Sequence, residues 1–329
     1  MSVVKPASSF AQCSGSRILV IGYGSIGRRH ARLFTEIGAE VTVVSRRAAA
    51  LSADGIVFCS SLTAIQDPHF DYAVIASETS AHLRDLQALR ACDWAQDIPV
   101  LVEKPLLASE AQLTALAGVT GKSIVYLGFN LRFLPVVQEA RRQLAPDQPL
   151  IRAEFHSHSY LPHWRPDQDY RATSSARRVS GGGVLRDLSH ELDLLYWFAG
   201  QPTDLEAFGG HLSALELDVE DNVVIVGASA RCRLFSVSLS YTQHFETRSL
   251  KLISEDKTVV ADLMSGELTV ATSNGVQKSL HPCQDFDDTY RDMHAAILRG
   301  GDVRPTSFEG GCANVELIER LTSKVWAAS

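Results

Sequence analysis

The stretch that decides the fold is RILVIGYGSIGRRH, residues 17–30. It opens with a short, continuous apolar run at 18–21 that is β-branched at three positions, which is typical of a strand buried on both faces of a parallel sheet. GYGSIG follows at 22–27, and a helical stretch over 28–38 comes next. This order of strand, glycine turn and helix is the context in which a G-x-G-x-x-G motif binds a dinucleotide.

Each glycine of this motif has a physical role. Gly22 permits the tight turn from strand to helix, Gly24 lets the backbone approach a pyrophosphate, and Gly27 lets the helix pack close to the strand. The free N–H groups of the first helical turn, which includes Ser25 and Ile26, would face the diphosphate at the favourable end of the helix dipole. We therefore expect these five residues to hold a dinucleotide; the alternative is a glycine-rich turn without a ligand.

Composition limits what the rest of the chain can be. The 329 residues are 45% hydrophobic, which suffices for a sizeable core and for two domains. The net charge of -7 and the scattered lysines and arginines give no indication of a nucleic-acid surface, and no apolar run approaches the ~20 residues of a membrane span. The six cysteines are far apart without a C-x-x-C pair, so we interpret them as reduced and the protein as cytoplasmic.

Residues 17–130 alternate between expected strands and expected helices. This alternation predicts an α/β fold with a doubly wound parallel sheet, a Rossmann domain, preceded by a loose polar tail at 1–16. After the first strand and helix, we expect strands at 40–45, 56–58, 72–76, 99–102 and 124–127, and helices at 80–91 and 109–117.

The pattern changes after residue 130. Nothing long enough for helical crossovers separates the later strands, so 131–329 is predicted to be an α+β domain with an open, mainly antiparallel sheet. Such a sheet needs a cover on its other face, and we therefore expect a homodimer or homotetramer that forms through it. Helices are expected at 134–144, 184–200, 286–299 and 307–328, and strands at 151–160, 222–226, 234–241, 249–253 and 258–262.

The end of the second strand bears on the choice of cofactor. An NAD site carries an acidic residue about 20 positions past the glycines, where it binds the ribose 2′-hydroxyl. Here the strand ends in Ser45, Arg46 and Arg47, and Glu40 lies at its opposite end. A hydroxyl followed by two guanidinium groups suits a 2′-phosphate, so we favour NADP(H), with NAD(H) also possible. The alternative is that both arginines are merely solvated.

Two further motifs carry candidate chemistry. Glu103, Lys104 and Pro105 end a buried strand, where the lysine could donate to a substrate oxygen; the alternative is a surface lysine. In GGGVLRDLSHELD, residues 181–193, Asp187 and His190 are three apart and are predicted to project from one face of a helix. A histidine held by a carboxylate can move the proton that accompanies a hydride, whereas the alternative is a buried structural histidine.

Together these motifs resemble the glucose–fructose oxidoreductase / inositol dehydrogenase / MocA-like family of NAD(P)-dependent oxidoreductases. The resemblance rests on GYGSIG, VIAS at 74–77 with His82, the EKP tripeptide, GFNLRF at 128–133 and the glycine-rich helix. It implies that Lys104 contacts substrate and nicotinamide, and that Asp187 and His190 bind a sugar or cyclitol and shuttle the proton. From these motifs we also expect Ser77, His82, Glu103 and Asn130 to contact the cofactor and Arg132 the substrate.

One departure from the family pattern bears on the proton shuttle. The family's spacing from this aspartate to its histidine is four residues, whereas here it is three and Glu191 stands at the spacing of four. Either His190 takes the role with a small rotation of the helix, or Glu191 does. We favour His190.

The loop after residue 160 resembles family members of bacterial surface-polysaccharide and nonulosonic-acid sugar pathways. Its aromatic side chains could stack on a sugar, and its arginines could pair with a carboxylate or a nucleotide-sugar phosphate. The alternative is a loop that fills an oligomer interface. The candidates are Tyr160, Trp164, Arg165, Tyr170 and Arg171.

The sequence thus predicts an enzyme that transfers a hydride between NADP(H), or NAD(H), and a hydroxyl or keto group of a sugar, sugar acid, nucleotide sugar or cyclitol. No metal is implied, since the histidines lack ligand spacing. Two rival hypotheses remain. One is a non-catalytic dinucleotide-binding sensor on the same fold, and the other is a reductase of the biliverdin or imine type.

Overall fold

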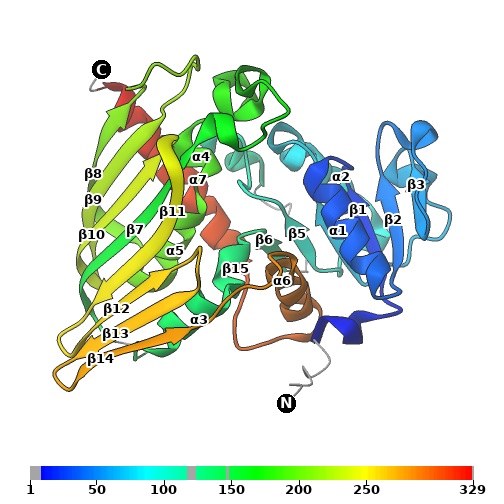
Figure 1. Cartoon of the computed structure of the whole chain (residues 1–329). Helices are drawn as coiled ribbons and strands as arrows, with labels where there is room; N and C mark the ends of the chain where they lie inside the picture. Colours follow the sequence, from blue (N-terminus) through cyan, green and yellow to red (C-terminus); the bar gives the residue numbers. More distant parts are fainter. Residues whose placement is uncertain (1–8, 117–123, 146–147, 328–329) are drawn as a thin grey trace. The chain divides into compact units, whose positions relative to one another are not determined.

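The computed structural model describes residues 9–116, 124–145 and 148–327. The chain divides into two compact units, each built on its own sheet (Figure 1). The first unit comprises the residues up to 133 together with 285–315, and the second comprises 134–284 and the residues from 316 onward. The predicted division assigned all of 131–329 to the second domain, whereas in the structure residues 285–315 belong to the first unit.

The first unit contains a seven-stranded sheet in the order β15-β6-β5-β4-β1-β2-β3. Six strands pair in parallel, and β15 (Thr306–Ser307) joins the edge antiparallel to β6. The order reverses at β1, which confirms the predicted doubly wound Rossmann sheet. The parallel strands are β1 (Arg17–Ile21), β2 (Glu40–Val44), β3 (Ile56–Cys59), β4 (Tyr72–Ile75), β5 (Val100–Val102) and β6 (Val125–Leu127).

Helices of this unit bury apolar faces in two separate clusters. Helices α1 (Ser25–Glu36) and α6 (Asp287–Arg299) contribute to one cluster, and α2 (His82–Arg90) contributes to the other. The helix expected at 109–117 is instead two 3-10 turns, η6 (Glu110–Gln112) and η7 (Thr114–Leu116); residue 117 lies outside the described residues.

The predicted loose tail is wrong for residues 9–13. These form a 3-10 helix, η1 (Ser9–Cys13), whose Phe10 and Cys13 side chains are fully buried. The Phe10 ring lies 5.3 Å from the ring of Phe34 on α1. One phenylalanine and one cysteine thus anchor a polar segment to the first core cluster. Residues 1–8 of the expected tail lie outside the described part of the chain.

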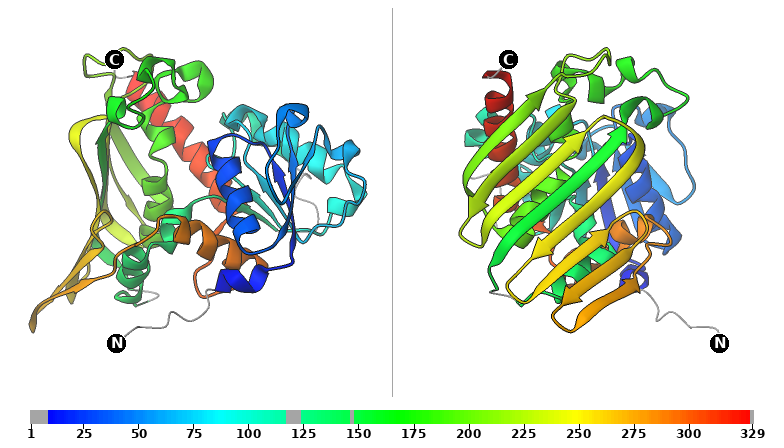
Figure 2. Two further views of the ribbon diagram at one scale, coloured as in Figure 1. Left: turned by 45° about the vertical axis from the view of Figure 1, so that its right-hand side comes forward. Right: turned by 60° about the vertical axis from the view of Figure 1, so that its left-hand side comes forward.

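The second unit contains an eight-stranded sheet in the order β14-β13-β12-β11-β7-β10-β9-β8. The pairing is antiparallel, as predicted, except between β7 and β10, which run parallel. Helices α3 (Pro135–Arg142) and α5 (His190–Ala199) pack on one face, and Figure 2 shows the other face without a covering helix. The strands are β7 (Leu150–Tyr160), β8 (Pro202–Gly210), β9 (Asn222–Ser229), β10 (Cys232–Ser240), β11 (Thr242–Ile253), β12 (Lys257–Asp262), β13 (Glu267–Thr272) and β14 (Gly275–Leu280).

The helix expected at 184–200 is broken into two. It comprises α4 (Val184–Asp187) and α5, separated by Leu188 and Ser189. The last helix, α7 (Phe308–Ala327), begins in the first unit and ends in the second. Within the described ranges, no helix combines the length and apolarity that a bilayer crossing requires.

Candidate active site

The glycine turn after β1 has the close contacts that its motif requires. Gly22 has a φ of +98°, and a Cβ there would lie 2.6 Å from the backbone nitrogen of Ser77. A Cβ on Gly27 would lie 2.2 Å from the carbonyl oxygen of Gly22, so α1 packs directly on the turn. Around Gly24, by contrast, a Cβ would meet nothing within 4 Å. Two glycines therefore serve the fold, and the third faces open space.

The residues around this turn fit a dinucleotide. The N–H of Arg28 donates to the carbonyl of Gly24 at 3.0 Å, and the N–H groups of Ser25, Ile26 and Gly27 precede this first helical bond. The Ser77 hydroxyl is buried and has no hydrogen-bond partner among the residues that the structure describes. A buried orphan hydroxyl beside free helix N–H groups suits a polar, anionic ligand.

Alanine substitutions should separate the two kinds of glycine. We expect Gly27→Ala to lower the free energy of unfolding by about 2 kcal/mol, because the new methyl group overpacks against the Gly22 carbonyl. Gly24→Ala should leave it within about 0.5 kcal/mol but raise the cofactor Kd about tenfold by crowding the diphosphate. Urea unfolding and fluorescence titration with reduced cofactor measure both. Equal loss of stability in the two variants would contradict this assignment.

The adenosine end of the predicted cofactor site lies one strand away. Ile21 of β1 pairs with Val44 of β2, and the N–H of Gly22 donates to the Val44 carbonyl at 2.9 Å. Ser45 therefore follows at the same sheet edge as the glycine turn, and Arg46 and Arg47 are exposed there.

The EKP tripeptide reaches this edge on the other side of β1. Ile75 of β4 pairs with Val102 of β5, and the N–H of Glu103 donates to the Ile75 carbonyl at 2.9 Å. Lys104, half-buried, is thus two strands from the glycine turn, with the Ser77 turn between them. The structure brings together the glycine turn, Ser77 and Lys104 at one carboxyl edge, as in other ligand sites of open α/β sheets.

Two predicted cofactor residues are engaged by the protein itself. His82 is 1% exposed, and its Nδ1 lies 3.0 Å from the carbonyl oxygen of Pro105 while its Nε2 lies 3.1 Å from that of Ser77. Burial lowers the pKa of His82, whereas the backbone oxygens of Ser77 and Pro105 act in the opposite direction. A neutral ring can donate to only one of these two carbonyl oxygens at a time. The Asn130 amide is also buried and donates to the Thr289 hydroxyl at 2.7 Å. Arg132 lies nearby in η8 (Asn130–Phe133) and is half-buried.

In the second unit, the glycine run at 181–183 lies against a buried carboxyl group. Gly183 has a φ of +113°, and a Cβ there would lie 2.3 Å from Oε1 of Glu220. That carboxylate is 2% exposed and accepts the N–H of Leu185 at 3.2 Å, and burial raises the pKa of Glu220. The glycine run therefore makes room for Glu220 at the start of α4.

The break between α4 and α5 places Asp187 and His190 on different helical segments. The prediction that both project from one continuous helix is therefore wrong. Asp187 ends α4, where its Oδ2 accepts the hydroxyl hydrogen of Tyr241 at 2.7 Å, and His190 is the first residue of α5. The backbone leaves the helical conformation at Leu188, with φ -97° and ψ 27°, before α5 begins.

The Glu191 carboxylate forms an ion pair with Arg248. Its side chain is 2% exposed and accepts two hydrogen bonds from Arg248, one from Nε at 2.6 Å and one from Nη2 at 2.9 Å. This fork geometry holds the carboxylate against β11.

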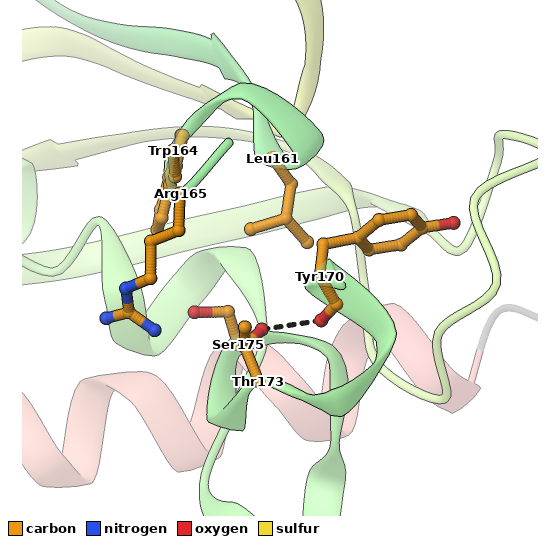
Figure 3. Close-up of a pocket in the computed structure, with 6 residues that line it drawn as sticks. All are labelled: Leu161, Trp164, Arg165, Tyr170, Thr173 and Ser175. Carbon is orange, nitrogen blue, oxygen red and sulfur yellow. Dashed lines mark hydrogen bonds between the residues drawn. The ribbon is translucent and has the colours of Figure 1, made fainter. Parts of the chain in front are cut away.

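The loop after β7 forms a pocket. Figure 3 shows its lining, which includes the predicted Trp164, Arg165 and Tyr170. The indole N–H of Trp164 donates to the Ser159 hydroxyl at 2.9 Å, and the indole packs edge-on against Tyr241 at 5.3 Å. Tyr241 therefore touches both a pocket wall and Asp187. The complete lining is Leu161, Trp164, Arg165, Tyr170, Thr173 and Ser175.

Two members of the predicted substrate set lie elsewhere. The Arg171 guanidinium pairs with Asp169 at 2.9 Å and Glu216 at 3.0 Å. Tyr160 packs against His244 at 4.2 Å, and strand alternation directs it to the face of the sheet opposite Ser159. Sequence patterns did not identify Tyr241 or Glu220 as site residues. The acidic pair at 220–221, between apolar stretches, was the available signal for Glu220.

Comparison with protein-family models identifies both units. Residues 16–127 match the oxidoreductase family with an NAD-binding Rossmann fold, and residues 152–260 match the GFO/IDH/MocA C-terminal domain. The chain belongs to the Gfo/Idh/MocA oxidoreductase family. The predicted family and enzyme class are thereby confirmed. A search of curated proteins gave no match for this Gfo/Idh/MocA protein.

Solved structures share the fold over nearly the whole chain. A UDP-N-acetylglucosamine 3-dehydrogenase from Acidithiobacillus ferrooxidans is 19% identical, with 95% of this chain and 98% of that chain covered and a TM-score of 0.76. An oxidoreductase from Agrobacterium radiobacter in complex with NAD+, L-tartaric acid and magnesium is 17% identical, with 96% and 98% covered and a TM-score of 0.80. A levoglucosan dehydrogenase with NADH and L-sorbose is 18% identical, with 95% and 97% covered and a TM-score of 0.79. At such identities the similarity establishes the fold of this Gfo/Idh/MocA protein.

Proposed function

We propose that this protein acts in the cytoplasm and transfers a hydride between a nicotinamide cofactor and a hydroxyl or keto carbon of a sugar-type substrate. The observation that carries the proposal is the placement of the glycine turn, the orphan Ser77 hydroxyl and Lys104 at one edge of the first sheet. The substrate class follows from the family and from the aromatic loop pocket, and includes sugars, sugar acids, nucleotide sugars and cyclitols.

Three side chains handle the proton in this proposal. When bound, the nicotinamide ring takes up or gives the hydride, so oxidation of an alcohol carbon also releases the hydroxyl proton. Lys104 and His190 hold or move that proton at the substrate oxygen, and Asp187, itself fixed by Tyr241, orients His190 or binds substrate. Glu191 is committed to Arg248, which supports the assignment to His190.

The loop pocket supports an acidic sugar as substrate. Trp164 offers apolar ring area for a sugar face, and Arg165 offers a guanidinium for a carboxylate or phosphate. The Tyr170 ring points away from the other lining side chains, and its hydroxyl accepts the N–H of Glu216 at 3.0 Å. Two of the structurally similar proteins are named for action on UDP-N-acetylglucosamine and on levoglucosan. Arg171 is paired with Asp169 and Glu216, so we assign the acidic group to Arg165.

A substrate screen tests the function. The purified chain is mixed with NAD+ or NADP+ and with panels of sugars, cyclitols, uronic acids and nucleotide sugars, and absorbance of the reduced nicotinamide is followed. Steady-state turnover on a sugar-type compound is expected, with greater activity on acidic members. Cofactor binding without turnover on any panel would favour a sensor, and turnover only on imines or biliverdin would favour the other rival.

We infer a preference for NADP(H), with NAD(H) usable. The support is that Arg46 and Arg47 are exposed, and Ser45 half-buried, beside the glycine turn, where two guanidinium groups and a hydroxyl suit a 2′-phosphate. The KM for NADP+ should be about tenfold below that for NAD+, and Arg46→Ser with Arg47→Ser should remove most of the difference. A lower KM for NAD+ in the unaltered enzyme would overturn this preference.

We also propose a homodimer or homotetramer that forms through the second sheet. Phe208 and Val224 are 65% and 44% exposed and are cross-strand partners on β8 and β9. Adjacent apolar side chains of this kind mark an interface. Light scattering should give the mass of two or four chains, and Val224→Glu should reduce it to one; a monomeric parent protein would refute the proposal.

A further inference from the structure

A chain of four buried side chains crosses the interior of the first unit. Nε2 of His30 on α1 lies 2.9 Å from Oε1 of Glu103, and Nδ1 of His30 lies 2.9 Å from Nε2 of His294 on α6. Nδ1 of His294 in turn lies 3.0 Å from the hydroxyl of Tyr72 on β4. Four different segments of the chain thus meet in one continuous hydrogen-bonded series.

The series is closed to water at its far end. Tyr72, His30 and His294 are each 0% exposed, and Glu103 is 7% exposed. Because a proton shuttle needs an exit to solvent, this geometry does not suit transport of protons. Buried polar groups in such a series instead require that every donor meet an acceptor.

That requirement fixes the direction of the hydrogen bonds. If Glu103 is ionised, it accepts from Nε2–H of His30, whose Nδ1 accepts from Nε2–H of His294, whose Nδ1 accepts from the Tyr72 hydroxyl. If every bond ran in the opposite direction, the Tyr72 oxygen would accept from His294 and its O–H would have no acceptor among the described residues. Burial lowers the pKa of His294 and raises that of Tyr72, so both stay neutral near pH 7.

The series ends beside the proposed catalytic lysine. Oε2 of Glu103 accepts the backbone N–H of Lys104 at 3.2 Å. A Cβ on Gly128 would lie 2.8 Å from Oε1 of Glu103, so the β6 end packs directly on the carboxylate. The Glu103 carboxylate is therefore held by hydrogen bonds to His30 and to the Lys104 backbone, and Gly128 leaves the room that it occupies.

We propose that Tyr72, His294 and His30 are positioning residues that hold the Glu103 side chain fixed against the Lys104 backbone. This inference rests on the proposed function, because it gives Lys104 the proton-handling role. Glu103 accepts the Lys104 backbone N–H, so a displaced carboxylate would also shift the backbone that positions the Lys104 side chain. Loss of the terminal donors should therefore alter proton transfer at Lys104 without a direct contact to the substrate.

Other titratable groups that face the series do not supply its donors. Tyr290 from α6 packs edge-on against His30 at 5.5 Å, and burial raises its pKa. Tyr126 from β6 and Cys13 from η1 act electrostatically on Tyr72, and Glu103 acts on His82. The Arg29 guanidinium lies 5.2 Å from the centre of the Tyr290 ring and is paired with Asp287 at 3.1 Å.

The first test needs no substrate. In the 15N-labelled full chain without cofactor, NMR of the histidine ring nitrogens at pH 7.5 should place the ring hydrogen of His30 and of His294 on Nε2, with assignments from His30→Gln and His294→Gln. A hydrogen on Nδ1 of either ring would overturn the series. This result stands whether or not the protein turns over a sugar.

The second test uses matched variants and steady-state kinetics. Tyr72→Phe and His294→Leu should each lower kcat about tenfold with the cofactor KM nearly unchanged. Because both variants loosen the carboxyl group that holds the Lys104 backbone, the acidic limb of the kcat profile should also move. His294→Gln retains one donor and one acceptor and should restore most of kcat.

The control is Tyr290→Phe, which removes a hydroxyl group that contacts the same core but does not belong to the series. It should leave kcat and the pH profile unchanged. Folded Tyr72→Phe and His294→Leu proteins with the kcat and acidic limb of the parent would refute the proposal. Absence of any turnover in the parent would refute the proposed function alone, since the NMR result still decides the series.

Discussion

Replacement of Lys104 by methionine should lower kcat about a thousandfold, within the range that general acid–base groups contribute. Methionine retains an unbranched side chain of similar length at this half-buried position but cannot donate to a substrate oxygen. The Kd for reduced cofactor should change by no more than about threefold, because the glycine turn and Ser77 are untouched. Steady-state kinetics and fluorescence titration measure the two quantities.

The control for Lys104→Met is Lys278→Met. Lys278 lies on the exposed strand β14 and pairs with Glu267 at 2.8 Å, far in sequence from any proposed site residue. It should retain the kcat of the parent. A Lys104→Met enzyme with kcat within threefold of the parent would remove this lysine from the reaction.

His190→Asn should lower kcat about a hundredfold and remove one limb of the pH profile, because asparagine cannot take up the proton. Glu191→Gln should act differently. It leaves Arg248 without its buried carboxylate, so the free energy of unfolding should fall by about 3 kcal/mol, while kcat per folded molecule changes much less. Kinetics combined with urea unfolding separate the two effects.

The outcome of this pair decides between the two candidates for the proton shuttle. Near-full turnover by His190→Asn, together with a large loss of kcat and normal stability in Glu191→Gln, would assign the role to Glu191. Asp187 is common to both alternatives, and its bond from Tyr241 persists in both variants.

Local patterns predicted the first sheet well. The apolar run at 18–21 and the glycine spacing at 22–27 specify a buried strand, a tight turn and a close helix through neighbouring residues alone. The carboxyl-edge position of Lys104 followed from the same logic, because parallel strands end at one edge. The family resemblance then supplied the expected chemistry.

Contacts between distant residues were beyond such patterns. His30 and His294 are 264 positions apart, and Tyr241 reaches Asp187 across 54. The break between α4 and α5 could not be predicted either, because neither Leu188 nor Ser189 is a helix-breaking glycine or proline. Phe10 was judged part of a loose tail because a single buried aromatic residue does not produce a periodic pattern.

The return of residues 285–315 to the first unit constrains how this enzyme can be dissected or recombined. A fragment that stops near residue 133 would lack Met293 and His294, both fully buried in that unit, and the edge strand β15. Chimeras that exchange nucleotide-binding halves between homologous enzymes must therefore transplant two separate segments of polypeptide. A single crossover point would leave Tyr290, Met293 and Ala295 of one hydrophobic core in the wrong parent.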